Sequence, residues 1–386
     1  MKERDFDVTI VGAGLAGLQC ARLLAKQGVR VLLADRKPSL EQKIHTTGIF
    51  VRRTLEDFDI PEDCIGPVVR NVSLYSPSYR VLNLESKHDE FRVGRMGQLY
   101  NRYLNQCRHS DVQWLPAATY LDSVQINDRS IVRFSLDNSI TSVSTRFLIG
   151  ADGASSRVAR HLQLDTNQEM IVGLENVYSD VPRAGAPRLH CFLNPKLAPG
   201  YIAWVACDGE HAHVGVGGYV NRFDPASALT TFEKEIRKIF DVRQCQRIER
   251  RGGRIPVGGV LKRIANTRGL LIGDAAGAVS PLTAGGLDPC MRLSTLAAKV
   301  TTEFLATEDA VALQRYSGQL FRSRFVSRIW ARRVAAQINS KFLTEVGFAA
   351  LRLPFFTKLA AHVFFGRGSF PDVEPVIAAE VQTFET

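Results

Sequence analysis

Three glycine-rich segments, far apart in the chain, carry residues whose types and spacing could bind a nucleotide. They are residues 12–17 (Gly-Ala-Gly-Leu-Ala-Gly), 150–157 (Gly-Ala-Asp-Gly-Ala-Ser-Ser-Arg) and 270–277 (Leu-Leu-Ile-Gly-Asp-Ala-Ala-Gly). A glycine turn lets a ligand approach the backbone closely, and free N–H groups at the start of a helix favour phosphate. The chemistry that the first segment could support is therefore the binding of a pyrophosphate.

The elements around the first segment are those that such a site requires. Residues 8–11 form an apolar, β-branched run of strand length, and residues 15–25 have a helical pattern. Between them Gly12 permits the tight turn, Gly14 leaves room for a pyrophosphate, and Gly17 lets the helix pack against the strand. The segment is thus predicted to be a phosphate-binding strand–turn–helix unit.

A second apolar run, residues 29–34, ends at Asp35. An acid about 20 residues beyond the glycine motif accepts hydrogen bonds from the adenosine ribose in dinucleotide-binding folds. A glycine-rich turn without a ligand is the alternative interpretation, but strand, spacing, helix and acid together favour a dinucleotide.

Composition limits the classes of protein to consider. The 386 residues carry a net charge of +10, and no basic-aromatic motif supports nucleic-acid binding. No segment reaches the ~18 uninterrupted apolar residues of a membrane span, and the first residues lack a signal-peptide core, so we expect a cytoplasmic protein. Seven widely spaced cysteines argue against a disulfide framework, and no metal site is predicted.

The remaining pattern predicts two kinds of sheet. Alternating stretches within residues 123–143 predict a β-meander, and residues 170–220 predict antiparallel strands. A helix is predicted at 93–107, and residues 288–365 are expected to be mostly helical. Residues 40–91 show no regular pattern.

The expected fold class is α/β plus α+β, in which an antiparallel-sheet substrate or cap domain interrupts a Rossmann-like domain and a helical region follows. The predicted ranges are 1–76, 92–160 and 265–300 for the nucleotide domain, 77–91 and 161–264 for the substrate domain, and 301–386 for the helical region.

Taken together, the three segments resemble the FAD-dependent aromatic hydroxylase superfamily, the group A flavoprotein monooxygenase-like proteins. This resemblance implies FAD as cofactor and a dinucleotide domain of the GR2 type. It places Asp152 near the pyrophosphate, Asp274 on the ribityl chain, and Arg95 near the ribityl chain and flavin. An aspartate that leaves a buried strand at a glycine turn is also a natural ligand-facing residue.

Residues 252–256 (Gly-Gly-Arg-Ile-Pro) and 273–287 resemble the geranylgeranyl reductase family within that superfamily. The resemblance implies that Pro281, Gly285 and Gly286 line the flavin and that the helix expected from about Asp288 points at its pyrimidine edge. Backbone N–H groups there would stabilise the negative charge of reduced flavin. The residues expected to bind the cofactor are Gly12, Ala13, Gly14, Leu15, Ala16, Gly17, Asp35, Arg36, Arg95, Asp152, Gly273, Asp274, Pro281, Gly285, Gly286 and Leu287.

Two departures from the family concern the substrate. The family's early Cys-x-Gly corresponds here to Thr46-Thr47-Gly48, without a cysteine, and its Tyr-x-Trp-x-Phe-Pro strand keeps only Trp204. We expect Thr47, Gly48 and Trp204 to contact the substrate and Tyr201 to face the opposite side of the strand. No catalytic residue is assigned, and Cys290 is expected to be a buried small side chain.

The favoured function is an FAD-dependent oxidoreductase that reduces C=C bonds of an isoprenoid or similarly apolar small molecule. NADPH or NADH, or an unknown electron donor, would reduce the flavin, which supplies the hydride. An FAD monooxygenase or halogenase-like enzyme acting on an aromatic or polyketide substrate uses the same three segments and stays open. A non-enzymatic flavoprotein is the third interpretation.

Two features near the C-terminus have two interpretations each. The arginines of residues 322–333 are expected to form a solvated helix face, with contact to anionic lipid or to an anionic cofactor as the alternative. The phenylalanines of residues 342–365 are expected to form helix-packing core. A wall of a substrate tunnel, or a helix that contacts a membrane peripherally, is the alternative.

Overall fold

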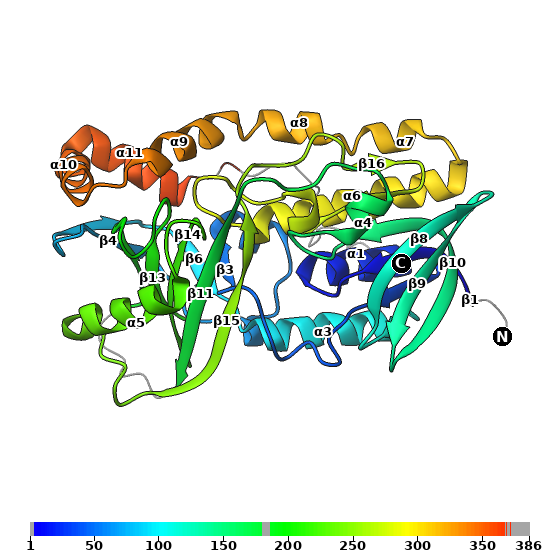
Figure 1. Cartoon of the computed structure of the whole chain (residues 1–386), viewed down its shortest axis with the longest axis horizontal. Helices are drawn as coiled ribbons and strands as arrows, with labels where there is room; N and C mark the ends of the chain where they lie inside the picture. Colours follow the sequence, from blue (N-terminus) through cyan, green and yellow to red (C-terminus); the bar gives the residue numbers. More distant parts are fainter. Residues whose placement is uncertain (1–3, 180–185, 367, 369–370, 372–386) are drawn as a thin grey trace.

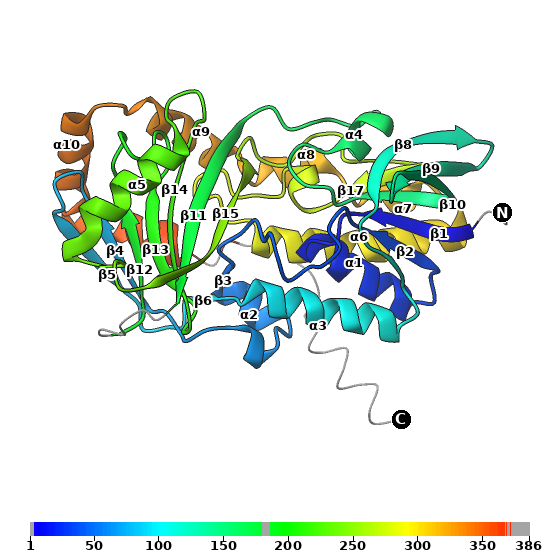
Figure 2. The same cartoon turned by 60° about the horizontal axis from the view of Figure 1, so that its bottom comes forward.

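The computed structural model describes residues 4–179, 186–366, 368 and 371, and two large sheets dominate it. In Figure 1 the second sheet lies on the left and the first on the right, and Figure 2 shows the same arrangement from below. The predicted fold class, a Rossmann-like domain interrupted by a largely antiparallel sheet and followed by helices, is confirmed.

The first sheet has the strand order β16-β17-β10-β1-β2-β7, with β8 and β9 joined to β10 as a meander. Strands β17, β10, β1, β2 and β7 run parallel, so their carboxyl ends meet at one edge, where ligands bind in open α/β sheets. The strands are β1 (Arg4–Val11), β2 (Val31–Ala34), β7 (Gln113–Leu115), β8 (Thr119–Ile126), β9 (Arg129–Leu136), β10 (Ser139–Gly150), β16 (Ala265–Asn266) and β17 (Gly269–Leu271).

The second sheet has the order β15-β11-β14-β13-β12-β4-β5, and every neighbouring pair is antiparallel except β12 with β4. The strands are β4 (Asn71–Tyr75), β5 (Val81–Glu85), β11 (Met170–Ser179), β12 (Arg188–Phe192), β13 (Ala203–Cys207), β14 (Ala212–Gly218) and β15 (Gln246–Pro256). A small pair, β3 (Ile49–Val51) with β6 (Phe91–Val93), lies apart from both sheets.

The helices cover the outer faces and one long edge of the molecule. Helices α1 and α6 pack together beside the first sheet, α5 covers one face of the second sheet, and α7 to α11 run along the top of Figure 1. The helices are α1 (Leu15–Lys26), α2 (Arg52–Asp57), α3 (Met96–His109), α4 (Arg157–His161), α5 (Pro225–Glu235), α6 (Leu287–Thr307), α7 (Val311–Gln314), α8 (Gly318–Ser323), α9 (Val326–Gln337), α10 (Lys341–Leu351) and α11 (Pro354–Phe365), with short 3₁₀ turns at Glu62–Cys64, Ile236–Lys238 and Gly273–Ala276.

Side chains along each strand of the second sheet point alternately to its two faces, one of which is packed in a core while the other is open. Val205, Val214 and Val216 pack with Leu229 and Phe232 of α5. The intervening residues of these strands therefore face away from α5, toward the first sheet's carboxyl edge. That open face carries the polar groups described below.

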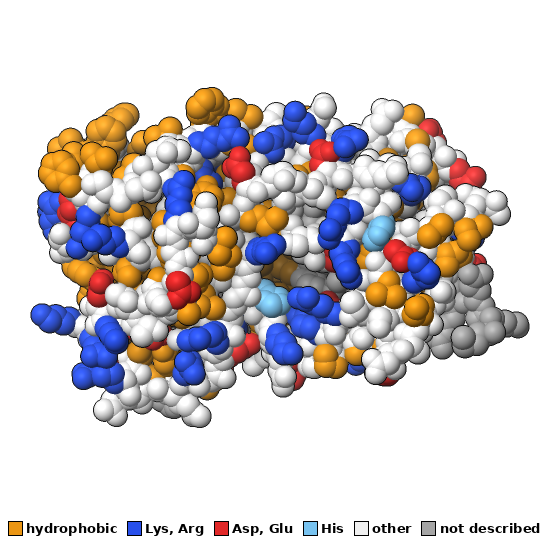
Figure 3. Space-filling view, viewed as in Figure 1, with side chains coloured by type: hydrophobic (Ala, Val, Ile, Leu, Met, Phe, Trp, Pro, Cys, Tyr) orange, Lys and Arg blue, Asp and Glu red, His pale blue; other side chains and the backbone are white. Residues whose placement is uncertain are grey.

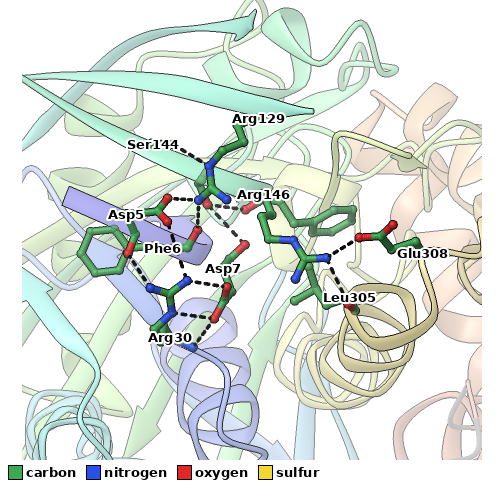
Figure 4. Close-up of polar contacts among 11 residues, drawn as sticks. Asp5, Phe6, Asp7, Arg30, Arg129, Ser144, Arg146, Leu305 and Glu308 are labelled. Carbon is green, nitrogen blue, oxygen red and sulfur yellow. Dashed lines mark hydrogen bonds and ion pairs between the residues drawn. The ribbon is translucent and has the colours of Figure 1, made fainter. Parts of the chain in front are cut away.

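An exposed set of ion pairs braces the opposite end of the first sheet (Figure 4). We call Asp5, Asp7, Arg30 and Arg129 the edge cluster. Arg30 pairs with Asp7 at 2.9 Å and with Asp5 at 3.8 Å, and Arg129 pairs with Asp5. Asp5 and Asp7 lie on β1, Arg30 directly precedes β2, and Arg129 begins β9, so these pairs tie β1 to both of these strands.

Two sequence expectations about the elements need correction. Residues 40–91 are not irregular, since they contain β3, α2, β4 and β5 and end in β6. Strand β15 was not predicted, because its charged run Gln-Arg-Ile-Glu-Arg-Arg lacks an apolar face. The domain boundaries stay a prediction, but the pairing of β4 with β12 puts residues 71–75 in the second sheet, outside the predicted range 77–91.

Among the described residues, no single helix has the length and apolar composition to cross a bilayer. Helices α10 and α11 satisfy that test only as a pair, and they are bent by 99° at the break between them.

Candidate active site

A cavity of about 1500 Å³ lies where the carboxyl edge of the first sheet faces the open face of the second. The loops after β1, β2, β10 and β17 all line it, as the parallel order requires. Figure 3 shows a hollow in the middle of this face with Lys, Arg and His side chains at its rim. The predicted cofactor loops therefore converge on one cavity that also reaches the second sheet.

The first glycine segment leaves space where a phosphate would lie. Gly12 has a φ of +106°, and a Cβ there would lie 2.2 Å from the carbonyl oxygen of Ala151. A Cβ on Gly17 would lie 1.9 Å from the carbonyl oxygen of Gly12, so the helix packs directly on the turn. A Cβ on Gly14 would meet nothing within 4 Å, and Gly14 lines the cavity. The three glycines thus have the separate roles expected of a dinucleotide turn.

Asp35 fixes the geometry of this turn from the end of β2. Its Oδ2 accepts a hydrogen bond of 2.7 Å from the N–H of Ala13, and its Oδ1 accepts one of 2.8 Å from the N–H of Lys37. Because a carboxylate has about four acceptor positions, Asp35 can still accept bonds from ribose hydroxyls. Arg36 follows it on the cavity wall.

Asp152 lines the cavity, but its carboxylate is bonded to the start of α4. It accepts hydrogen bonds from Ser156 Oγ at 2.6 Å and from the N–H groups of Arg157 at 2.7 Å and Val158 at 3.2 Å. Burial raises the pKa of Asp152 despite these bonds. The side chain therefore holds the second glycine segment and α4 together beside the cofactor loops.

The third glycine segment and the loop after it present a carboxylate and a hydroxyl to the cavity without partners among the described residues. Asp274 lines the cavity, no side-chain hydrogen bond joins its carboxylate to the described chain, and burial raises its pKa to about 6. Ser280 Oγ is likewise buried and has no partner there. Helix α6 starts at Leu287 without a side-chain cap. These free groups fit FAD, which offers ribityl hydroxyls to a carboxylate and carbonyl oxygens of its ring to helix N–H groups.

Most predicted cofactor residues line this cavity, and four do not. Ala13 and Gly17 are buried behind the turn, and Pro281 is buried beside Gly259. Arg95 instead pairs with Glu210 at 3.0 Å and donates to the carbonyl of Asp63 at 3.1 Å. The predicted residues on the cavity wall are Gly12, Gly14, Leu15, Ala16, Asp35, Arg36, Asp152, Gly273, Asp274, Gly285, Gly286 and Leu287.

The three predicted substrate residues lie on the same cavity, around a carboxylate that was not predicted. Thr47 donates from Oγ1 to Glu175 Oε2 at 2.6 Å, and Trp204 donates from Nε1 to the same oxygen at 3.2 Å. Gly48, at a φ of +88°, completes the loop beside Thr47. Glu175 lies on β11 and is itself buried on the cavity wall.

Glycines of the second sheet make this arrangement possible. In the register of the sheet Trp204, Gly215 and Glu175 lie in one row across β13, β14 and β11. A Cβ on Gly215 would lie 2.3 Å from the indole of Trp204 and 2.9 Å from Glu175. The missing side chain therefore lets Trp204 reach across β14 to the carboxylate.

The expectation that Tyr201 faces away from Trp204 is wrong. Tyr201 precedes β13, so strand alternation does not apply to it, and the two ring centroids are 6.4 Å apart. Both rings lie over Gly217. The Tyr201 hydroxyl donates to the carbonyl of Thr283 at 2.7 Å, which ties the second sheet to the loop before α6.

The expectation of a solvated arginine face fails for two of the five arginines. Arg332 is 3 % exposed and donates to the carbonyls of Pro281 and Gly200, both at 3.1 Å. Arg322 donates to the carbonyls of Gly258 and Val260. These loops leave carbonyl groups without strand partners, and the long arginine side chains supply the donors.

The predicted phenylalanine core is wrong for three of the six side chains. Phe342 and Phe355 are 72 % and 73 % exposed, Phe356 is 39 % exposed, and Phe348 is buried. The reason is that α10 and α11 are the last helices and use one face only against the second sheet. Cys290, by contrast, is buried as expected, and burial raises the pKa of its thiol.

Behind Glu175 lies a chain of titratable groups that no sequence motif revealed. His213 Nδ1 lies 3.3 Å from Glu175 Oε1, its Nε2 lies 3.5 Å from Asp208 Oδ2, and His211 Nδ1 lies 3.4 Å from the same Asp208 oxygen. We call Glu175, His213, Asp208 and His211 the relay cluster. Among the described residues, no group of His, Cys, Asp and Glu side chains could hold a metal ion.

The charges of the relay cluster support one another. Burial alone would lower the pKa of His213, but the nearby carboxylates of Glu175 and Asp208 raise it to about 9. Burial alone would raise the pKa of Glu175, but His213, Thr47 and Arg251 hold it below its usual value. His213 in the same way lowers the pKa of Asp208. Near neutral pH the cluster therefore holds a histidinium between two carboxylates.

Comparisons with known proteins agree with this site. The family model described as FAD binding domain matches residues 5–60 and 117–320. A digeranylgeranylglycerophospholipid reductase of Methanopyrus kandleri is 29 % identical over 365 residues, which cover 89 % of this chain and 93 % of that protein.

Solved structures give the same fold. A geranylgeranyl bacteriochlorophyll reductase-like protein of Thermoplasma acidophilum has a TM-score of 0.82 at 21 % identity and covers 98 % of this chain and 99 % of its own. The p-nitrophenol 4-monooxygenase of Pseudomonas putida has a TM-score of 0.70 at 16 % identity, with 96 % and 100 % covered. The predicted resemblance to the geranylgeranyl reductase family is confirmed, and the hydroxylases share the fold at greater distance. The chain belongs to the FAD binding domain family and is an FAD-dependent oxidoreductase.

Proposed function

We propose that this protein reduces C=C bonds in an isoprenoid or similarly apolar chain and that NADPH or NADH supplies the electrons. One observation carries the proposal. A single cavity runs from the glycine turn after β1, past Trp204 and Glu175, to the apolar side chains Leu359, Val363 and Phe364 of α11. Such a cavity suits a long apolar substrate whose reacting bond lies between a dinucleotide cofactor and the second sheet.

The residues around the cavity have distinct tasks in this proposal. FAD, when bound, supplies the hydride. The Gly12–Gly17 turn and the start of α1 hold the pyrophosphate, Asp35 the ribose, and Asp274 the ribityl chain. The N–H groups at the start of α6 stabilise the negative charge of the reduced ring.

Cationic side chains on the cavity wall support an anionic nicotinamide cofactor as the reductant. Arg36, Arg157 and Arg254 all line the cavity. Phosphate groups are attracted by such guanidinium groups, which can bind two phosphate oxygens at once. Anaerobic mixing with NADPH and with NADH tests this step, because the bleaching of the flavin absorbance reports reduction directly.

We also place the protein peripherally at a lipid bilayer. Figure 3 shows apolar side chains gathered at the upper left, over α10 and α11, with Lys and Arg side chains nearby. The exposed apolar side chains of these helices include Phe342, Leu343, Val346, Phe355 and Leu359. Lys341 and Lys358 on these helices and Arg352 in the break between them are exposed, as contact with anionic lipid requires.

Co-sedimentation with vesicles tests the membrane contact. Vesicles that contain anionic lipid should bind the wild-type protein, and Phe342→Ser with Phe355→Ser should release it. The matched control replaces the exposed Val124 and Ile126 of β8 by Ser, because they lie on the first sheet, away from α10 and α11. Equal binding of all three proteins would refute the contact.

The reductase function is tested with the reduced protein in the absence of oxygen. Incubation with a lipid that carries geranylgeranyl chains should add one H₂ per double bond, detected by mass spectrometry. Hydroxylation or halogenation of an aromatic substrate, seen only in air, would instead support the monooxygenase or halogenase alternative, which the shared fold leaves available.

Asp274→Ala tests the cofactor site itself. We expect this variant to purify with little FAD, because the ribityl hydroxyls lose their carboxylate. Gly347→Ala serves as its control, since a Cβ at that helical glycine meets nothing within 4 Å. An Asp274→Ala protein with the full FAD content would remove the assignment.

A further inference from the structure

A reduction of an alkene by hydride needs a proton for the second carbon, and nothing above assigns its source. The residues on the cavity wall that are able to carry a proton include Glu175, His45, Tyr100, Asp274 and Asp288. Asp288 is engaged by Thr54 and Arg292, and Asp274 belongs to the third glycine segment. Glu175 differs because it lies on the substrate side, between Thr47 and Trp204.

The relay cluster links Glu175 to the outside of the protein. His211 is partly exposed, with 31 % of its side chain accessible, whereas Asp208, His213 and Glu175 are 5 %, 1 % and 4 % accessible. Successive groups are 3.4, 3.5 and 3.3 Å apart. The chain of groups thus starts at solvent and ends on the cavity wall, and each of its members has an oxygen or nitrogen atom that can accept a proton.

A purely structural role explains this cluster poorly. Taking three charged groups out of water costs several kcal/mol per ion, and well-packed apolar residues often give equal or greater stability at such positions. The row Trp204–Gly215–Glu175 moreover uses a glycine where any side chain would separate the indole from the carboxylate. Both features keep an acid oriented toward the cavity.

On the basis of the proposed function, we infer that Glu175 donates the proton to the alkene and that His213, held by Asp208, resupplies it. One alkene carbon receives the hydride with its electron pair. Because Glu175 is a carboxylate near neutral pH, it first takes the proton of the His213 imidazolium and then passes that proton to the carbon that holds the electron pair of the broken π bond. This step forms the new C–H bond and restores the carboxylate, and solvent reprotonates His213 through Asp208 and His211. Glu175 is the catalytic acid, and His213 and Asp208 are positioning residues.

The surrounding charges allow the proton to move in this direction. Arg251 on β15 lies 3.9 Å from Glu175 Oε1 and also binds Glu249 at 2.7 Å, so its charge is shared. The other polar contacts of Glu175 come from Thr47 and Trp204, which are neutral. His45 binds the carbonyl of Gly252 at 2.8 Å and stays outside the cluster. The group that can pass a proton to Glu175 is therefore His213.

The decisive experiment uses the FAD-loaded protein, reduced with dithionite and mixed anaerobically with a geranylgeranyl lipid. Glu175→Gln keeps the size and the acceptor oxygen for Thr47 and Trp204 but has no acidic proton. We expect reoxidation of the flavin by the lipid to slow about 10²- to 10⁴-fold, the usual contribution of a general acid. FAD content, reduction by dithionite and the lipid concentration for half-maximal rate should not change.

Glu233→Gln is the matched control. Glu233 accepts hydrogen bonds from Asn176 at 2.7 Å and Tyr178 at 2.6 Å on the α5 side of the sheet. It does not line the cavity, so its variant should keep the wild-type rate. A wild-type protein that reduces no alkene would overturn the proposed function together with the donor role. A wild type that reduces the lipid no faster than Glu175→Gln would overturn the donor role alone.

A second readout needs no turnover. The ¹⁵N resonances of the oxidised, FAD-loaded protein labelled in histidine should show His213 as an imidazolium at pH 8. Its assignment comes from the resonance lost in His213→Asn. In Glu175→Gln the same ring should become neutral at that pH, because its nearest negative charge is gone. A neutral His213 in the wild-type protein at pH 7 would contradict the relay.

Discussion

The edge cluster and the relay cluster both join charged side chains across neighbouring strands, yet one faces water and the other a cavity. In the edge cluster Arg30 and Asp5 are 58 % and 48 % accessible (Figure 4), whereas His213 and Glu175 in the relay cluster are 1 % and 4 % accessible. Exposed ion pairs add little to the free energy of unfolding, because water and salt screen their charges. Buried charges depend on one another, because each is left unsolvated without its partner. Although the N–O distances in the two clusters are similar, we therefore expect mutations in the relay cluster to cost far more stability than mutations in the edge cluster.

The largest effect is expected from removing the centre of the relay cluster. His213→Leu leaves Glu175 and Asp208 as buried carboxylates without their shared cation. Breaking a buried ion pair in this way costs about 3–5 kcal/mol. Urea unfolding of the wild-type and variant proteins at pH 7 measures the loss. A loss below about 1 kcal/mol would place the relay cluster in the same class as the edge cluster.

The next effect is a pH dependence of stability that belongs to His213. Its pKa is raised from about 6.5 to about 9 in the folded protein, so folding binds a proton more tightly. The stabilisation is fully present below pH 6.5 and is lost as the pH rises to about 9. The linked free energy is of the order of 3 kcal/mol. Urea unfolding at pH 6.5 and pH 9.5 should show this decline in the wild type and not in His213→Asn. If stability fell equally with pH in the wild type and in His213→Asn, the titration would belong to another group.

A smaller effect should follow from filling the gap at Gly215. Gly215→Ala places a Cβ against the indole of Trp204 and against Glu175. Overpacking of this kind costs typically about 1–3 kcal/mol. The change in Trp204 should also appear as altered tryptophan fluorescence. Gly347→Ala in α10, where the added atom meets nothing, should leave both stability and fluorescence unchanged.

The smallest effect is expected in the edge cluster. Arg30→Ala removes both pairs of an exposed guanidinium and should cost below about 1 kcal/mol. Because the Debye length shrinks with added salt, the difference from the wild type should vanish near 1 M NaCl. Thermal unfolding at low and high salt checks this. A cost that survives 1 M salt would mean that the edge cluster acts through packing and not through charge.

Features of the site that depend on residues close together in the sequence could be predicted, whereas features that depend on the fold could not. The turn at Gly12 and the acid Asp35 were predictable, because the strand, the glycine spacing and the helix that define them lie within about 25 residues. The three glycine segments also placed Asp274 at the cavity. The relay cluster was not predictable, since Glu175, Asp208 and His213 come from two strands and a turn and share no spacing rule. Tyr201 and Arg332 were misjudged because their partners are carbonyls of loops that only the fold brings near.

The parallel pairing of β4 with β12 has a consequence for synthesis of the protein. Strand β4 ends at Tyr75, but its neighbour in the second sheet begins only at Arg188. At a translation rate of about 5–20 residues per second, the hairpin of β4 and β5 waits roughly 5–20 s on the ribosome before that neighbour exists. During this time one edge of β4 is an open template for pairing with other chains. An interruption of translation in this interval would release a fragment prone to aggregate, so the yield of folded protein depends on how fast the middle of the message is read.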